Sequence, residues 1–228
     1  MSGESSREAA KRRAGQRAVE EVTDEMVVGL GSGSTAGFAI DALGAACEEG
    51  LAIEGVPTSH QAAARARSAG VVLRSLSDVD RVDLAIDGAD EVAGRTLLKG
   101  GGASQTREKI VATAAERFVV VVDRSKLVEK LSAPVPLEVL PEAERPVRER
   151  IDELGGKAIV REASAKSGPV ITDNGNFVID AAFGPIADPA ALSRTLGELP
   201  GVLEHGLFVQ AADELVIGSP DGVRHKRL

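Results

Sequence analysis

The sequence predicts an α/β protein in which helices cover a parallel sheet, followed by a smaller α+β domain. Apolar runs rich in Val, Ile and Leu alternate with helical segments up to about residue 130, an order typical of strand–helix–strand units. Aromatic residues make up 2% of the chain, so the core must be aliphatic, which suits strands buried on both faces. A chain of 228 residues is long enough for a good-sized core and a smaller second one.

The first part of the chain starts with an amphipathic helix and then alternates strands with helices. The periodicity and the turn residues predict helices at 7–22, 35–49, 59–70 and 104–116, and strands at 26–30, 51–56, 71–76, 82–87 and 118–123. Strands that are connected through helices pair in parallel, with right-handed crossovers. This pattern predicts one main parallel sheet.

The pattern changes after about residue 130. The proline-rich stretch 131–146 is interpreted as a crossover, and it leads to helix 144–156, strand 157–162, a strand pair within 168–183, helix 188–199 and strand 201–209. Asn174-Gly175 between apolar runs predicts a type I′ hairpin turn. The order of elements predicts a small α+β (ferredoxin-like) domain at 131–206. Residues 1–130 and 207–228 are expected to form the main domain, with 214–220 returning to its sheet.

Composition excludes several classes of function. The net charge is −8, so there is no broad basic surface for nucleic acid, and few aromatic side chains are available to stack on bases. Neither a signal-peptide core nor an apolar stretch long enough to span a bilayer is present. Cys47 is the single cysteine, which excludes an internal disulfide, and it is expected to be buried on helix 35–49. These features predict a cytoplasmic protein without a membrane partner.

The stretch GLGSGSTA (29–36) links a strand to a helix. Gly31 and Gly33 permit a tight turn, and the N-terminus of the following helix attracts anions. The hydroxyls of this loop would suit a phosphate monoester; they belong to Ser32, Ser34 and Thr35. The same glycines also fit the dinucleotide-binding fingerprint, with Glu54 as the ribose ligand. The loop alone therefore leaves sugar phosphate, dinucleotide and a structural turn open.

The stretch DGADE (87–91) comes at the carboxyl end of a predicted parallel strand, where ligands of α/β sheets bind. Asp87 and Asp90 repel each other unless they are hydrogen-bonded, bound to a metal or facing a polyol. A local turn with a helix cap is the structural alternative. A magnesium site is a further one, because paired carboxylates are usual ligands of this ion.

The stretch KGGGASQTREKI (99–110) adds a lysine, three glycines and a glutamate. Consecutive glycines cost conformational entropy, but they let a substrate approach the backbone. Lys99 supplies positive charge, and Glu108 lies early in the next predicted helix. A carboxylate base facing a lysine across a carbon acid can abstract a proton next to a carbonyl. The alternative for Glu108 is a solvated first-turn carboxylate.

In this order, GLGSGSTA, DGADE, KGGGASQTREKI and TDNGN closely resemble the A-type ribose-5-phosphate isomerase family, from about Lys11 to the C-terminus. The resemblance implies a Rossmann-like main domain and a smaller α+β domain. It also implies an aldose–ketose isomerase that interconverts ribose 5-phosphate and ribulose 5-phosphate through a cis-enediolate. No cofactor or metal is implied, and the expected assembly is a homodimer or homotetramer.

The resemblance also implies roles for individual residues. Glu108 matches the base that transfers the proton, Asp87 and Asp90 match carboxylates that assist ring opening, and Lys99 matches the lysine near the reacting oxygens. Expected substrate-binding positions are Ser32, Gly33, Ser34, Thr35, Gly88, Ala89, Gly100, Gly101, Gly102, Lys126 and Lys11. Ser32 stands where the family often has threonine, and the hydroxyl is retained.

Three other functions are alternatives to the isomerase. A nicotinamide-dependent oxidoreductase would use the Gly31 fingerprint and Glu54. A non-enzymatic sugar-phosphate sensor would leave Glu108 and Lys99 without a task. A coenzyme A transferase would use a glutamate nucleophile, but DGADE fits it poorly. The three histidines are scattered, and each is expected to be on the surface or incidental.

Overall fold

A computed structural model describes residues 3–228. The chain forms two compact units: the first comprises residues up to Ala89, Arg107–Leu127 and Ala211–Leu228, and the second comprises Asp90–Thr106 and Val128–Gln210. This division differs from the predicted domains mainly by assigning residues 90–106 to the second unit. Within residues 3–228, no helix is long and apolar enough to cross a membrane.

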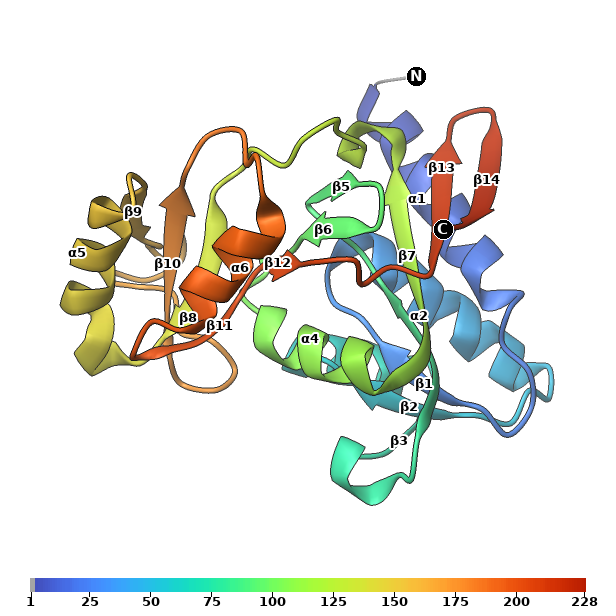
Figure 1. The fold of residues 1–228 in the computed structure, drawn as a ribbon. Coiled ribbons are helices and arrows are strands. Elements are labelled where there is room, and N and C mark those ends of the chain that lie inside the picture. The colour runs from blue at the N-terminus through green and yellow to red at the C-terminus, as the bar shows by residue number, and fades with distance from the viewer. Residues whose placement is uncertain (1–2) are drawn as a thin grey trace. The chain divides into compact units, whose positions relative to one another are not determined.

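The first unit contains a seven-stranded sheet in the order β14-β13-β7-β4-β1-β2-β3 (Figure 1). Its strands are β1 Val27–Leu30, β2 Glu54–Pro57, β3 Val72–Leu73, β4 Val82–Asp87, β7 Ala115–Asp123, β13 Glu214–Ser219 and β14 Gly222–Arg227. All pairings are parallel except that of β13 with β14. The predicted parallel sheet and the return of β13 to it are confirmed. The third strand, β3, is shorter than predicted, and β14 was not predicted.

Helices cover both faces of this sheet. Helices α1 Gly3–Val19, α2 Gly33–Glu48 and α3 His60–Ser68 supply small and aliphatic side chains to a core that includes Val28, Leu30 and Val119. Val111 of helix α4 (Gln105–Ala114) lies against the opposite face, because a Cβ at Gly29 would meet Val111 and Ala85. The aliphatic core predicted from the low aromatic content is confirmed.

The second unit contains a four-stranded antiparallel sheet in the order β11-β8-β10-β9. Its elements are β8 Val135–Val139, α5 Glu144–Glu153, β9 Lys157–Val160, β10 Phe177–Ala182, α6 Pro189–Gly197 and β11 Val202–His205. This βαββαβ order is that of a ferredoxin-like fold. A three-stranded sheet, β12-β6-β5, accompanies it, with β5 Glu91–Ala93, β6 Thr96–Leu98 and β12 Leu207–Phe208.

The interpretation of 131–146 as a crossover was wrong, because it contains β8, a strand inside the four-stranded sheet that is buried at all of its positions. Pro136 lacks the N–H that a central strand normally donates. Its carbonyl is still used, since it accepts a hydrogen bond from the Gly206 N–H at 2.8 Å. Burial of the alternating aliphatic side chains of β8 outweighs the missing donor.

Two further predictions need correction. The turn at Asn174-Gly175 is present, but only Gly175 has a positive φ (+86°), so it is not type I′. The Thr172 N–H donates to the Asn176 carbonyl, which gives a three-residue loop with glycine in the left-handed position. His205 was expected on the surface or without a role, but it is 3% exposed, and its Nε2 lies 2.9 Å from the Ser193 carbonyl.

Candidate active site

The predicted site residues fall into two groups, one in each compact unit. In the first unit, β1 and β4 are neighbours in the sheet, and the chain leaves β1 toward β2 on the other side. Such a reversal of strand order opens a crevice at the carboxyl ends of the strands. Leu30 and Asp87 are the last residues of β1 and β4. The glycine-rich loop and the first aspartate therefore lie at this edge.

Asp87 is held by the backbone of the glycine-rich loop. Its side chain is buried, and its Oδ1 accepts hydrogen bonds from the Ser32 N–H at 3.0 Å and the Gly88 N–H at 2.7 Å. A Cβ on Gly31 would lie 2.1 Å from the same oxygen. Glycine is thus required at position 31 so that the loop can approach the carboxylate, and the carboxylate in turn orders the loop.

The loop presents positive charge and hydroxyl groups at the N-terminus of α2. Lys11 Nζ donates to Ser34 Oγ at 2.9 Å. Ser32 Oγ lies 3.0 Å from Thr58 Oγ1 and donates to Ser59 Oγ at 2.7 Å. Gly33 adopts a φ of +85°, which an L-residue would reach only with strain. The ammonium group, the hydroxyls and the helix dipole together favour an anionic group such as a phosphate.

Lys126 follows the carboxyl end of another strand of the same sheet. It is half-buried in a short 3₁₀ helix, Arg124–Lys126, directly after β7. The Asp123 carboxylate caps this helix by accepting from the Ser125 N–H at 2.9 Å and from its hydroxyl at 2.5 Å. The cap fixes the backbone that carries Lys126.

Glu108 lies in the first turn of α4 and is 5% exposed. The alternative of a solvated surface carboxylate is therefore wrong. The N-terminal end of a helix favours a negative charge, whereas burial favours the neutral acid. A carboxyl group under these opposing influences is suited to exchange a proton during a reaction.

In the second unit, the three glycines form a loop that begins at Lys99. The Lys99 side chain is buried, with Nζ 5.6 Å from the centre of the Phe208 ring. The backbone N–H of Lys99 donates to the Gly206 carbonyl at 2.9 Å. The Asp90 carboxylate accepts from the Gly101 N–H at 2.8 Å. Asp90, Lys99 and the glycine loop therefore form one connected group.

Two buried or half-buried groups of the second unit were missed in the sequence. Arg161 pairs with the Asp180 carboxylate (Nε–Oδ2 2.8 Å), and its Nη1 donates to the carbonyls of Gly100 and Gly101 at 2.9 and 3.1 Å. Glu138, the fourth of the five residues of β8, is 0% exposed. The sequence offered one signal for Glu138, namely a carboxylate within an apolar strand. It offered no signal for Arg161, because an arginine at the end of a short strand is common.

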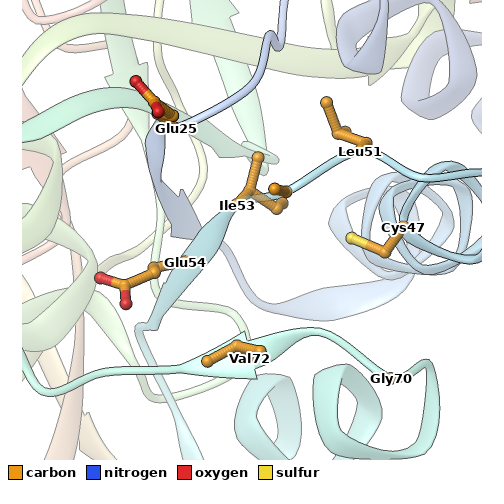
Figure 2. A pocket seen from close by; sticks show the side chains of 8 residues that line it. Glu25, Cys47, Leu51, Ile53, Glu54, Gly70 and Val72 are labelled. Atoms are coloured by element: carbon orange, nitrogen blue, oxygen red, sulfur yellow. The ribbon is translucent and has the colours of Figure 1, made fainter.

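The structure does not place Glu54 where the dinucleotide interpretation needs a ribose ligand. Glu54 is the first residue of β2, so it lies at the amino ends of the strands, and it pairs with Arg74. It lines a pocket of about 570 Å³ together with Glu25, Ile53 and Cys47 (Figure 2). Cys47 is partly buried on α2, and burial raises the pKa of its thiol. This pocket lies at the edge of the sheet opposite to Asp87.

A magnesium site would need several carboxylate oxygens grouped around one point. Within residues 3–228, no group of three or more His, Cys, Asp and Glu side chains is placed to hold a metal ion. The Asp87 oxygen nearest the loop is instead used by two backbone N–H groups.

The fold and the site define the class of the protein. It is a doubly wound α/β protein with a glycine-rich loop at the reversal of strand order, and the chain also contains buried carboxylates and a buried lysine. The model of the family "Ribose 5-phosphate isomerase A (phosphoriboisomerase A)" matches residues 54–222. The chain belongs to this family.

Relatives in sequence and structure agree with this assignment. Ribose-5-phosphate isomerase A of Natronomonas pharaonis is 55% identical over 95% of this chain and 96% of its own length. The ribose-5-phosphate isomerase A of Haloarcula marismortui is 55% identical over 97% of this chain and 96% of its own length. The solved ribose 5-phosphate isomerase A of Methanocaldococcus jannaschii superposes with a TM-score of 0.93 at 44% identity, covering 98% of this chain and 100% of that one. The structure of a D-ribose-5-phosphate isomerase in complex with phospho-erythronic acid superposes with a TM-score of 0.93 at 43% identity, and the match covers 96% of this chain and 98% of that one.

Proposed function

We propose that this chain interconverts D-ribose 5-phosphate and D-ribulose 5-phosphate, with Glu108 carrying the proton between C2 and C1 through a cis-enediolate. The aldose–ketose isomerase activity follows from membership of the family. A related isomerase binds phospho-erythronic acid, a phosphorylated sugar acid whose carboxylate resembles the charge of an enediolate. The observation that carries the role of Glu108 is its burial in the first turn of α4.

The phosphate of the substrate is assigned to the glycine-rich loop. Lys11 and the N-terminus of α2 supply positive charge there, and Ser32, Ser34 and Thr35 supply hydroxyl groups. Because this group is not altered in the reaction, its binding energy serves to hold the sugar in position. Lys126, on the capped turn after β7, is proposed as a second cation for the substrate.

The proposed reaction has three stages. Asp87 and Asp90 assist opening of the furanose by exchanging protons with its ring oxygen and anomeric hydroxyl. Glu108 then removes the proton from C2, and the electron pair moves toward C1 and its oxygen to form the cis-enediolate, which Lys99 and the N–H groups of the triple-glycine loop stabilise. Glu108 returns the proton to C1 while the hydroxyl proton passes from O2 to O1, so protons and electrons balance.

Glu108→Gln tests this assignment, because glutamine keeps the size of the side chain but cannot accept the proton. We expect kcat to fall on the order of 10²–10⁴-fold, with substrate binding retained. The assay follows ribose 5-phosphate by proton NMR in deuterated water, with and without a chelator. Wild type should incorporate deuterium at the exchanging carbon, and the variant should not.

Other outcomes would support different functions. Near-normal turnover of Glu108→Gln would remove the role assigned to this residue. Tight binding of the sugar phosphate by wild type without deuterium exchange would favour the sensor function. Loss of activity with the chelator would indicate a metal-dependent reaction. Micromolar binding of a nicotinamide cofactor would favour an oxidoreductase.

Location and assembly are also proposed from the sequence. A single cysteine fits a reducing cytoplasm, and the family resemblance implies a homodimer or homotetramer. Analytical ultracentrifugation of the full chain would distinguish these two assemblies from a monomer.

A further inference from the structure

We propose that Thr106 and Glu138 form a buried anchor that positions the first turn of α4, and with it the side chain of Glu108. Thr106 and Glu138 are positioning residues, because nothing places them in contact with the substrate. The inference rests on the proposed role of Glu108. It accounts for the TDNGN stretch, to which the isomerase reaction itself gives no task.

Glu138 is the centre of a cluster of hydrogen bonds in the second unit. Its carboxylate, which is 0% exposed, accepts from the Thr172 hydroxyl at 2.7 Å and from the side-chain amides of Asn174 and Asn176 at 3.0 and 2.8 Å. The hydroxyl of Thr106 donates to its other oxygen. Four neutral side chains therefore converge on one carboxylate.

The loop at 172–176 is shaped to deliver these donors. Thr172 Oγ1 also accepts from the N–H groups of Asn174 and Asn176, at 3.2 and 3.1 Å, and Gly175 closes the turn with its positive φ. A buried carboxylate is costly unless its oxygens are well hydrogen-bonded. The loop supplies three of the four donors, and the Glu138 Oε2 that accepts from Thr106 also accepts from the Asn174 amide at 3.2 Å.

Thr106 connects this cluster of hydrogen bonds to α4. The first N–H groups of a helix have no partners within the helix, so a first turn depends on contacts of its side chains. Thr106 is 7% exposed and lies two residues before Glu108. With 3.6 residues per turn, the two side chains lie about 200° apart around the helix axis. Thr106 thus holds the turn from one side while Glu108 projects from the other.

A proton-transferring carboxylate is sensitive to such an anchor. Displacement of a catalytic group by about 1 Å can cost on the order of 10²-fold in rate. Loss of the anchor should consequently lower kcat more than it raises KM, because the phosphate-binding loop is unaltered. A merely structural hydrogen bond would instead lower stability without changing the catalytic parameters.

The test compares Thr106→Val with Thr96→Val. Thr96 is a matched control, since it is 6% exposed in the same unit and its hydroxyl accepts bonds from Gln210 at 3.3 and 3.4 Å. We expect Thr106→Val to lower kcat about 10- to 100-fold with KM within about 2-fold, and to shift the acid limb of the pH–rate profile. Thr106→Ser should restore most of the rate, and Thr96→Val should keep it.

The results distinguish failure of the proposed function from failure of the anchor. Wild type that does not isomerise ribose 5-phosphate would refute the proposed function itself. If wild type is active but Thr106→Val keeps its kcat and pH profile while losing as much thermal stability as Thr96→Val, the anchor is only structural. Glu138→Gln provides a second check, because a neutral acceptor should reproduce the kcat loss in part. A fully active Glu138→Gln would also refute the inference.

Discussion

Gly31→Ala is the substitution for which the structure gives the most direct expectation. The added Cβ would lie 2.1 Å from Oδ1, 2.3 Å from Cγ and 2.5 Å from Cβ of Asp87. Ordinary contact for a Cβ begins at 3.4 Å, so the carboxylate must move by about 1.3 Å. Gly31 does not have a positive φ, and the backbone itself accepts alanine without strain.

This displacement gives the magnitude of the effect. Asp87 would lose its bonds to the Ser32 and Gly88 N–H groups, and a shift of about 1 Å in a catalytic group costs on the order of 10²-fold in rate. We therefore expect kcat/KM for ribose 5-phosphate to fall about 100-fold. Overpacking of a buried site should also lower the free energy of unfolding by about 1–3 kcal/mol.

The assay measures initial rates of ketose formation across substrate concentrations, with urea unfolding in parallel. Two other glycines serve as controls. Gly222→Ala, in the β13–β14 hairpin, adds a Cβ with nothing within 4 Å and should change neither quantity. Gly33→Ala also meets open space but requires a φ of +85°, so it should lose about 1–3 kcal/mol of stability through strain.

Two results would contradict the steric argument. Gly31→Ala with near wild-type kcat/KM would show that Asp87 can move without consequence, and hence that its fixed position is not needed for catalysis. Equal losses of rate in Gly31→Ala and Gly33→Ala would indicate that general disorder of the loop, rather than the clash with Asp87, causes the defect.

Two further predictions concern the glycine loop and pH. Arg161→Gln removes the charged donor to the loop carbonyls and should raise KM about 10-fold; steady-state kinetics check this, and Arg161→Lys should not rescue it, because lysine lacks the planar fork. Burial raises the pKa of Glu21, but the Arg17 hydrogen bond and the charges of His225, Arg17 and Arg117 outweigh it and hold the pKa below its usual 4.5. The stability that Glu21 contributes is thus present above pH 4.5 and lost as pH falls through the lowered folded pKa. Glu21→Gln should cost about 1 kcal/mol or less at neutral pH and nothing in strong acid, as urea titrations at several pH values would show.

The alternation of aliphatic strands and helices was sufficient to predict the main sheet, because strands buried on both faces leave a nearly continuous apolar pattern. The elements that were missed lack such a pattern. Strand β8 contains Pro136, strands β5 and β6 are three residues each, and β14 is largely exposed with four consecutive polar residues. In each case the partner strand, not the local sequence, decides that the segment is extended.

Asp87 and the glycine-rich loop lie together as their motifs predicted, whereas Asp90 and Lys99 fall in the second compact unit; the catalytic roles stay predictions. Strand ends of a parallel sheet share one edge, so the motifs alone bring Asp87 to the glycine-rich loop. The sequence left two expectations open for Glu108, a carboxylate with limited solvation and a solvated first-turn carboxylate, and its 5% exposure decides for the first. Arg161 and Glu138 were missed because their partners are distant in sequence.

The sequence by itself determined the parallel sheet, the position of the glycine-rich loop and the family, because these depend on local periodicity and short motifs. Only the tertiary structure decided how the carboxylates are held. Glu138 receives donors from Thr106 and Thr172, 32 and 34 residues away, and such contacts arise from chain packing that no local pattern encodes. The physical reason is that hydrogen bonding of a buried charge depends on which segments meet around it, and that is settled when the whole domain folds.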